Sequence, residues 1–147
     1  MNVKIRLLHN CEDIIATPQY ATDGSSGADL YAVNNDEICI KSNQIALIPC
    51  GFSMAIPEGY EAQIRSRSGL ALKNGVIVLN SPGTIDSDYR GEVKVILMNL
   101  SNSDFFVKKG MKIAQMVIAK VEKVSFCLVD ELDDTDRGEG GFGSTGV

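Results

Sequence analysis

The sequence predicts an all-β fold, a jelly-roll-like double antiparallel sheet, and two observations carry the prediction. Turn-forming clusters such as Asn34-Asn35-Asp36 and Pro57-Glu58-Gly59 recur along the chain. Between such clusters lie short segments rich in Val and Ile, namely Ala46 to Ile48, Val76 to Leu79, Val93 to Asn99 and Ile113 to Val121. Short strands separated by about 8–12 residues indicate a sandwich or barrel rather than alternating strands and helices.

Two segments refine this prediction. The most apolar stretch, Ile45 to Ile56, is interrupted by Pro49 and Gly51, so we expect two core strands there. Ser68 to Lys73 holds helix-forming residues and ends at Asn74-Gly75, which predicts one short helix of one or two turns.

The 147 residues are enough for one domain with a real core. We expect residues 1–130 to form this β-domain. Residues 131–147 are acidic and then Gly-rich, so we expect a flexible tail, because such a segment buries little apolar surface.

Charge and composition narrow the class of function. A net charge of −5 argues against duplex nucleic acid as the main partner but leaves room for a small polyanion held by a few arginines. No apolar run approaches the roughly 20 residues of a membrane helix, and Met1 to His9 lacks the apolar region of a signal peptide. We therefore expect a cytoplasmic protein.

Cysteine and histidine content argues against several chemistries. The only histidine is His9, and no C-x-x-C pair occurs among Cys11, Cys39, Cys50 and Cys127. A structural zinc site or a histidine-dependent triad is therefore not favoured. Chemistry is expected from carboxylates, arginines, hydroxyls or a hard metal ion.

Two segments have the composition of phosphate sites. In the tail, Arg137 precedes a run of glycines that holds Phe142, followed by Ser144 and Thr145. Glycine amides, an arginine and hydroxyls can surround phosphate, and the phenyl ring can stack on a base, although a disordered Gly-rich tail has the same composition. Arg65 to Leu70 offers arginines and a hydroxyl at a helix start, where the alternative is a solvated strand end with a capping serine.

Three further positions suggest a polar pocket. The segment Asn80 to Glu92 packs an amide, carboxylates and a tyrosine into one loop, in which Asp86 is either a general base or a turn carboxylate. Asp29 follows a glycine turn, where it could hold a Mg²⁺ aqua ion or form an Asx turn. Strict alternation would put Gln115 beside Ile113 and Val117 on an apolar face, where its amide needs a partner.

Taken in order, these segments resemble the five motifs of the trimeric dUTPases. The resemblance runs from about Ala21 to Gly146. The matching segments are Ser25 to Leu30, Arg67 to Ala71, Gly83 to Gly91, Gly110 to Gln115 and Arg137 to Gly146. Three positions depart from the usual pattern: Ser26 stands for Ala, Ser66 for Pro and Lys112 for Arg. None removes a group that the chemistry needs.

The resemblance implies a homotrimer with three active sites, each assembled from three subunits. It implies hydrolysis of dUTP to dUMP and pyrophosphate with Mg²⁺ as cofactor, which limits uracil incorporation into DNA and supplies dUMP for dTMP synthesis. No direct binding of nucleic acid or membrane is expected. The rival readings are a dCTP deaminase on a related fold and a non-catalytic jelly-roll module that binds nucleotides.

The resemblance also implies a role for each site residue. Asp29 would hold Mg²⁺ through water, and Asp86 would deprotonate the attacking water. Tyr89 would press on the sugar where a 2′-hydroxyl needs space. Phosphate would be bound by Arg67, Ser68, Gly69 and Gln115. Uracil and deoxyribose would be bound by Asn80, Gly83, Thr84, Ile85 and Lys94. The tail of another subunit would close the site with Arg137, Phe142, Gly143, Ser144 and Thr145.

Overall fold

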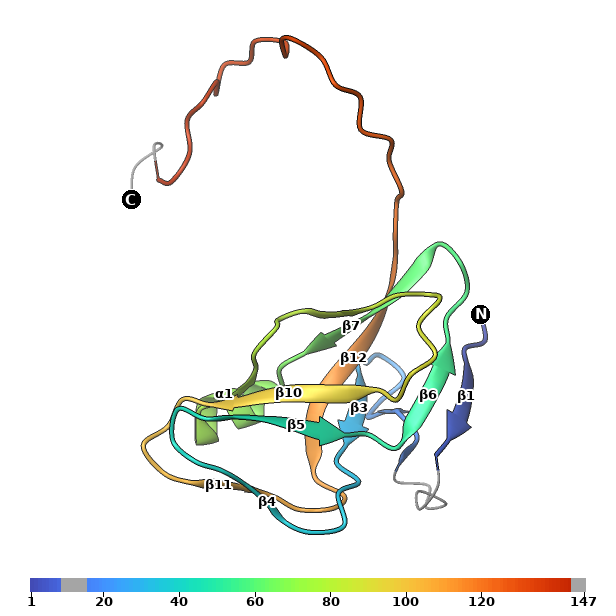
Figure 1. Cartoon of the computed structure of the whole chain (residues 1–147), viewed down its shortest axis with the longest axis vertical. Helices are drawn as coiled ribbons and strands as arrows, with labels where there is room; N and C mark the ends of the chain where they lie inside the picture. The colour runs from blue at the N-terminus through green and yellow to red at the C-terminus, as the bar shows by residue number, and fades with distance from the viewer. Residues whose placement is uncertain (9–15, 144–147) are drawn as a thin grey trace.

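The computed structural model describes residues 1–8 and 16–143 and shows short antiparallel strands with one short helix in this part (Figure 1). The first strands are β1 (Lys4–Leu7), β2 (Gln19–Tyr20), β3 (Ala28–Tyr31), β4 (Ile38–Ile40), β5 (Ile45–Pro49), β6 (Phe52–Ala55) and β7 (Tyr60–Arg65). The helix α1 (Ser68–Asn74) is followed by β8 (Val76–Val78), β9 (Gly83–Ile85), β10 (Lys94–Asn99), β11 (Phe105–Val107) and β12 (Lys112–Lys120).

Two main sheets enclose the core. One sheet has the strand order β2-β3-β12-β7-β9 and the other has the order β5-β10-β8, and Figure 1 shows β5 and β10 crossing in front of β12. The pairs β1-β6 and β4-β11 complete the described part. Buried side chains from both main sheets, such as Leu30 and Ile64 from one and Ile48 and Val95 from the other, belong to one cluster. The predicted all-β, jelly-roll-like double sheet is confirmed.

Helix α1 forms where the sequence predicts it. Arg67 precedes the helix in an extended conformation, and Gly75 ends it with a left-handed φ of 65°. The amide of Gly75 donates to the carbonyl of Ala71, which satisfies a carbonyl group at the helix end. Leu70 is the buried residue that attaches the helix to the core.

Strand β12 corrects the prediction of strict alternation. A register shift between Lys112 and Ala114 in the pairing with β3 marks a β-bulge. Because of the bulge, Ile113 and Ala114 are both buried, and Gln115 lies on the outer face opposite Asp29 of β3 rather than beside Ile113. The prediction of Gln115 on the apolar face was therefore wrong.

Strand β5 is a core strand only in part. Ile48 is fully buried, whereas Ile45 and Leu47 are each 55% exposed. The two strands predicted within residues 45–56 are present as β5 and β6, but one face of β5 is apolar and uncovered in the single chain. Such a face is typical of a surface that is covered by a partner.

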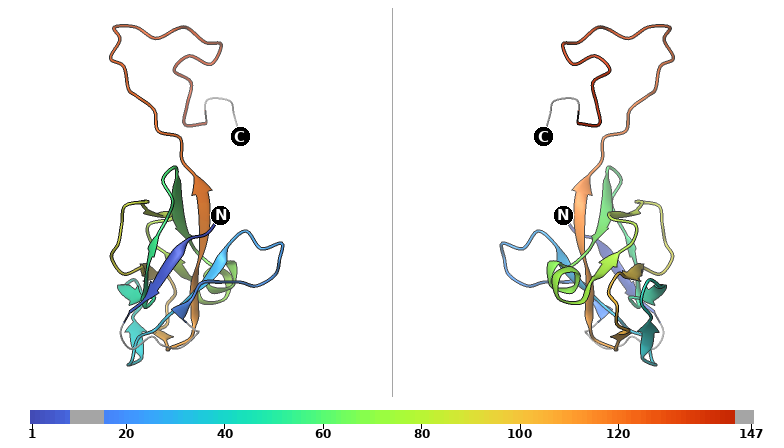
Figure 2. Two further views of the ribbon diagram at one scale, coloured as in Figure 1. Left: turned by 90° about the vertical axis from the view of Figure 1, so that its right-hand side faces the viewer. Right: turned by 90° about the vertical axis from the view of Figure 1, so that its left-hand side faces the viewer.

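The chain leaves the domain after β12. Side chains from Glu122 to Glu139 are exposed, and the backbone extends away from the sheets (Figures 1 and 2). This segment includes large apolar side chains such as Phe126 and Leu128, whose exposed fractions are 96% and 103%. Within residues 1–8 and 16–143, no helix is both long and apolar enough to cross a membrane.

Candidate active site

The loop between β9 and β10 forms one side of a cavity of about 310 Å³, which we call the hairpin pocket. Six of the predicted site residues line this pocket: Asn80, Thr84, Ile85, Asp86, Tyr89 and Lys94. Gly83 lies beneath the Asn80 side chain, since a Cβ at position 83 would stand 3.1 Å from the Asn80 amide nitrogen. The structure therefore brings the predicted nucleoside residues together.

Backbone pairing fixes the hairpin pocket. β9 pairs with β7 through Ala62, Gln63 and Ile64, and it is the last strand in the order of its sheet. An edge strand keeps unpaired N–H and C=O groups on its outer side. β9 therefore offers a rigid backbone edge with hydrogen-bonding capacity that is not used within its own sheet.

The turn after β9 positions Asp86 and Tyr89. The Tyr89 amide donates to the Asp86 carbonyl at 3.2 Å, which closes the turn. The Arg90 Nη1 group donates to the carbonyls of Ser87 and Tyr89 at 2.6 and 2.8 Å. Arg90 therefore holds this turn in shape from the solvent side.

Glu92 attaches the same turn to the connection between β5 and β6, a role that sequence reasoning missed. Its Oε1 accepts from the Gly51 amide at 3.2 Å, and its Oε2 lies 3.3 Å from the Lys94 Nζ. Its carbonyl accepts from the Tyr89 hydroxyl at 3.0 Å. The spacing of Glu92 and Lys94, which puts both side chains on one face of an extended segment, is the sequence signal for the ion pair.

Asp86 also borders a second cavity, of about 600 Å³, on the side of Tyr60 and Val121. Four carboxylates line it, from Glu58, Glu61, Asp86 and Asp88, against Arg90 and Lys123. An excess of negative charge repels a polyanion. The hairpin pocket is therefore the better candidate for nucleotide binding.

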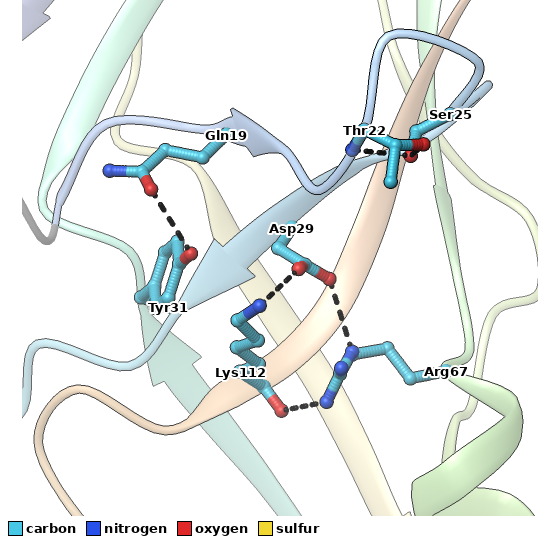
Figure 3. Close-up of polar contacts among 7 residues, drawn as sticks. All are labelled: Gln19, Thr22, Ser25, Asp29, Tyr31, Arg67 and Lys112. Atoms are coloured by element: carbon cyan, nitrogen blue, oxygen red, sulfur yellow. Dashed lines mark hydrogen bonds and ion pairs between the residues drawn. The ribbon is translucent and has the colours of Figure 1, made fainter.

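A separate group of predicted residues lines a cavity of about 360 Å³, which we call the charged pocket. The predicted residues in its lining are Asp29, Arg67, Ser68, Gly69 and Gln115. They come from β3, the start of α1 and β12, and Lys112 of β12 joins them (Figure 3). Sequence reasoning noted Lys112 as a departure from the motif but did not place it in the site.

A carboxylate bridged by two cations lies at the centre of the charged pocket (Figure 3). The Asp29 Oδ2 is 2.7 Å from the Lys112 Nζ, and its Oδ1 is 3.2 Å from the Arg67 Nε. The Arg67 Nη1 also donates to the Lys112 carbonyl at 3.1 Å. The hydrogen bond and charge of Asp29 raise the pKa of Lys112, so this ammonium stays protonated at neutral pH.

The charge balance of this pocket favours an anion. Its lining holds two cations, Arg67 and Lys112, and one carboxylate, Asp29. The lining also includes the hydroxyls of Ser25, Ser26 and Ser68, which can donate to phosphate oxygens. A chain with a net charge of −5 thus carries a locally positive pocket.

Gln115 is held at the wall of the charged pocket. Its Nε2 donates to the Ser66 carbonyl at 3.1 Å. A Cβ at position 27 would stand 2.6 Å from the Gln115 Oε1, so a side chain there would make the amide shift. The partner that the sequence required for Gln115 is therefore a backbone carbonyl.

The charged pocket meets the requirements of Mg²⁺ only in part. Among the described residues no group of three His, Cys, Asp or Glu could hold a metal ion, and both Asp29 oxygens face cations. Mg²⁺ prefers six oxygens and often combines one or two carboxylates with water and substrate phosphates. Asp29 fits a Mg²⁺ site that is shared with substrate phosphates, in which the carboxylate contacts the ion through water. Asp29 does not fit a Mg²⁺ site made by protein ligands alone.

The single chain does not unite all predicted residues. The hairpin pocket and the charged pocket have no lining residue in common. Phe142 is fully exposed, and Arg137 donates from its Nε to the Gly140 carbonyl at 2.8 Å within the tail. Gly143 is also exposed, and Ser144 and Thr145 lie outside the described residues. The described structure thus contains two half-sites and a separate tail.

Comparison with known proteins shows the family of the chain. The family model of dUTPases matches residues 13–146. A deoxyuridine 5′-triphosphate nucleotidohydrolase of Orientia tsutsugamushi (strain Boryong) is 58% identical over 147 residues, which is 100% of this chain and 99% of the relative.

Two solved structures share the fold. A mutant dUTPase of Staphylococcus bacteriophage 80alpha with dUpNHpp has a TM-score of 0.82 and 24% identity and covers 99% of both chains. A mutant dUTPase of phage phi11 of S. aureus, described with a structural Mg(II) ion, has a TM-score of 0.78 and 20% identity, covering 91% of this chain and 100% of its own. The family model and the Orientia relative show that the chain belongs to the dUTPase family.

Proposed function

We propose that this protein hydrolyses dUTP to dUMP and pyrophosphate in a homotrimer whose active sites each combine residues of three subunits. The observation that carries the proposal is the sorting of the predicted residues into two half-sites that share no lining residue. One half-site is polar and built on a backbone edge, as a nucleoside requires, and the other is locally positive, as a triphosphate requires. The activity named for the Orientia relative and the dUpNHpp bound to the phage enzyme support this assignment.

The hairpin pocket binds uracil and deoxyribose. The pairing edge of uracil presents an acceptor, a donor and an acceptor, which the free edge of β9 and the Asn80 amide can match. Cytosine would leave buried polar groups unpaired, which costs about 1–3 kcal/mol for each group. Thymine differs only by a methyl group and is excluded by steric fit against the hairpin.

The charged pocket binds the phosphates. Arg67, Ser68 and the Gly69 amide contact phosphate oxygens near the scissile bond, with Gln115 beside them. Asp29 would hold Mg²⁺ through water together with the substrate phosphates, and the ion would neutralise charge on the leaving pyrophosphate. Arg67 supplies a fixed positive charge to the same oxygens.

Asp86 acts as the general base. Its carboxylate accepts a proton from water while the water oxygen bonds to the α-phosphorus. The bond between this phosphorus and the bridging oxygen breaks, and pyrophosphate leaves with the electron pair. General-base catalysis by a positioned side chain contributes about 10²–10⁴-fold to the rate.

Exposed apolar surface supports the trimer. Ile45 and Leu47 on β5 and Phe126 and Leu128 after β12 are all more than half exposed in the single chain. Large exposed apolar side chains in this number mark surfaces that partners cover. We assign residues 1–130 to the β-domain and residues 131–147 to a lid that completes a neighbouring subunit's site with Arg137, Phe142, Gly143, Ser144 and Thr145.

The reaction removes a DNA precursor that carries uracil. Hydrolysis of dUTP lowers uracil incorporation into DNA and yields dUMP, the precursor of dTMP. We assign this role to the cytoplasm, with a small nucleotide as the substrate and no direct binding of nucleic acid.

A pyrophosphate-release assay across dUTP, dTTP, dCTP and UTP, with and without Mg²⁺, tests the activity. We expect rapid release from dUTP with Mg²⁺ and slow release from the other three nucleotides. Strong ammonia release from dCTP would instead establish a deaminase. Calorimetric binding of dUTP without any release would establish a non-catalytic module.

Mixed trimers test whether the site crosses subunits. Asp86→Asn and a deletion of residues 137–147 are each expected to inactivate the homotrimer. If the base and the lid come from different chains, co-expression of the two variants restores about a quarter of the sites by random assembly. No recovery in purified mixed trimers would mean that the base and the lid of one site come from the same chain.

A further inference from the structure

Tyr89 occupies the space where a side chain at position 91 would be. A Cβ built on Gly91 would stand 2.3 Å from the Tyr89 hydroxyl oxygen, 2.5 Å from its Cζ and 2.9 Å from its Cε2. All three distances are below the 3.0 Å that real Cβ contacts keep, and ordinary contact begins at 3.4 Å. The phenol end therefore lies directly against the glycine backbone.

The backbone gives no other reason for glycine at this position. The glycines with left-handed φ in the described residues include Gly51, Gly59, Gly75 and Gly110, whereas Gly91 is not among them. An alanine could adopt the Gly91 backbone without strain. The contact with the Tyr89 ring is what an added methyl group would disturb.

The hydroxyl and the backbone of Tyr89 have further contacts that anchor the residue in the turn. The Tyr89 hydroxyl donates to the Glu92 carbonyl at 3.0 Å, and the Glu92 side chain is held by the Gly51 amide and Lys94. Arg90 holds the Tyr89 carbonyl, and the Tyr89 amide closes the turn onto Asp86. A ring pushed off Gly91 would lose its hydroxyl contact, while the turn that carries Asp86 would keep its own hydrogen bonds.

We propose that Gly91 is a specificity-determining positioning residue, whose missing side chain sets how far the Tyr89 ring stands from the sugar in the hairpin pocket. This inference rests on the proposed function, in which Tyr89 excludes a 2′-hydroxyl. The Tyr89 hydroxyl oxygen would have to move from 2.3 Å to at least 3.4 Å from a Cβ at position 91. A shift of this size is comparable to the space that one added hydroxyl needs.

Displacement in either direction lowers the preference for dUTP over UTP. A ring pushed into the pocket presses on the deoxyribose of dUTP, while UTP is already excluded. A ring pushed out of the pocket admits the 2′-hydroxyl of UTP. Discrimination by close steric fit of a small group amounts to about 10–200-fold, so Gly91→Ala should reduce the ratio by about tenfold.

The experiment compares kcat/KM for dUTP and UTP in Tyr89→Ala, Gly91→Ala and the double variant. Gly24→Ala is the matched control, because a Cβ at position 24 meets nothing within 4 Å. We expect a lower dUTP-to-UTP ratio in both single variants and no change in the control. The double variant should match Tyr89→Ala, since Gly91 acts only through the ring.

The outcomes separate this inference from the proposed function. An unchanged ratio in Gly91→Ala, with a lowered ratio in Tyr89→Ala, overturns the role of Gly91 and leaves the sugar gate in place. An unchanged ratio in Tyr89→Ala removes the gate itself, and the inference with it. An additive loss in the double variant, or a fall in Tm without any change in the ratio, also overturns the inference.

Discussion

The hairpin pocket and the charged pocket are held together by different forces. β9 and the following turn position the hairpin pocket through backbone pairing and the attachment of Glu92 to Gly51. The charged pocket depends on ion pairs of Asp29 with Arg67 and Lys112. A backbone edge cannot move without unfolding its strand, whereas partly exposed ion pairs exchange partners at low cost.

This difference corresponds to the two tasks of the site. Recognition of a base requires fixed donors and acceptors, because one unmatched buried group is enough to reject the wrong base. Triphosphate binding requires positive charge that is available when the ligand arrives and can rearrange around it. Changes in the hairpin pocket should therefore alter turnover and substrate choice, and changes in the charged pocket should alter affinity and its salt dependence.

The largest expected effect is at Asp86 in the hairpin pocket. Asp86→Asn should lower turnover by roughly 10²–10⁴-fold while nucleotide binding persists, because the amide cannot accept the proton of the attacking water. Pyrophosphate release measures the turnover, and calorimetry with a non-hydrolysable dUTP analogue measures the nucleotide binding.

Asp88→Asn is the matched control for this prediction. Asp88 is an exposed carboxylate in the same turn, but it lines the cavity of about 600 Å³ beside Tyr60 and Val121 and not the hairpin pocket. It should keep near-normal turnover. Equal losses in the two variants would assign the effect to the charge of the turn instead of a base.

The next largest effect concerns the tail, which lies in neither pocket in the described structure. Deletion of residues 137–147 should abolish most of the activity but leave trimer size and Tm nearly unchanged, because the described part of this segment packs against no core. Light scattering and thermal unfolding report the structure, and pyrophosphate release reports the activity. A clear fall in Tm would make the segment structural.

The fold was predictable because its signals are local. Turn clusters separate the strands, and the Asn74-Gly75 pair ends α1 at the expected point. The bulge in β12 was not predictable, because it depends on the pairing with β3 and has no signature in β12 alone. One inserted residue reverses the faces, which is why the prediction for Gln115 was wrong.

The sequence predicts which residues belong to the candidate site, but it does not predict the contacts between them. The order of the motifs selected Asp29, Arg67 and Asp86, and their assigned roles stay predictions. Lys112 was noted only as a departure from the usual Arg, since nothing in the sequence says that its ammonium reaches Asp29 across the strand pair. The contact of Tyr89 with Gly91 likewise requires the three-dimensional path of the turn.

The smallest expected effect is at Lys112, where the nature of the charged pocket can be measured directly. Arg67 has a second contact, with the Lys112 carbonyl, whereas the Lys112 ammonium is held by Asp29 and lies 5.9 Å from the centre of the Tyr31 ring. Lys112 is therefore the cation that can turn from Asp29 to a phosphate. Lys112→Met should raise KM for dUTP by about tenfold, the equivalent of one charge-assisted hydrogen bond, with little change in kcat.

Lys120→Met is the matched control, because Lys120 ends the same strand and pairs only loosely with Glu122 at 3.6 Å. Lys120→Met removes one positive charge, as Lys112→Met does, but at a position outside both pockets. If the charged pocket works by exchangeable ion pairs, the dependence of KM on salt should weaken in Lys112→Met and not in Lys120→Met. Equal effects of the two variants would mean that the net charge of the protein governs binding, and the contrast between the two pockets would then not hold.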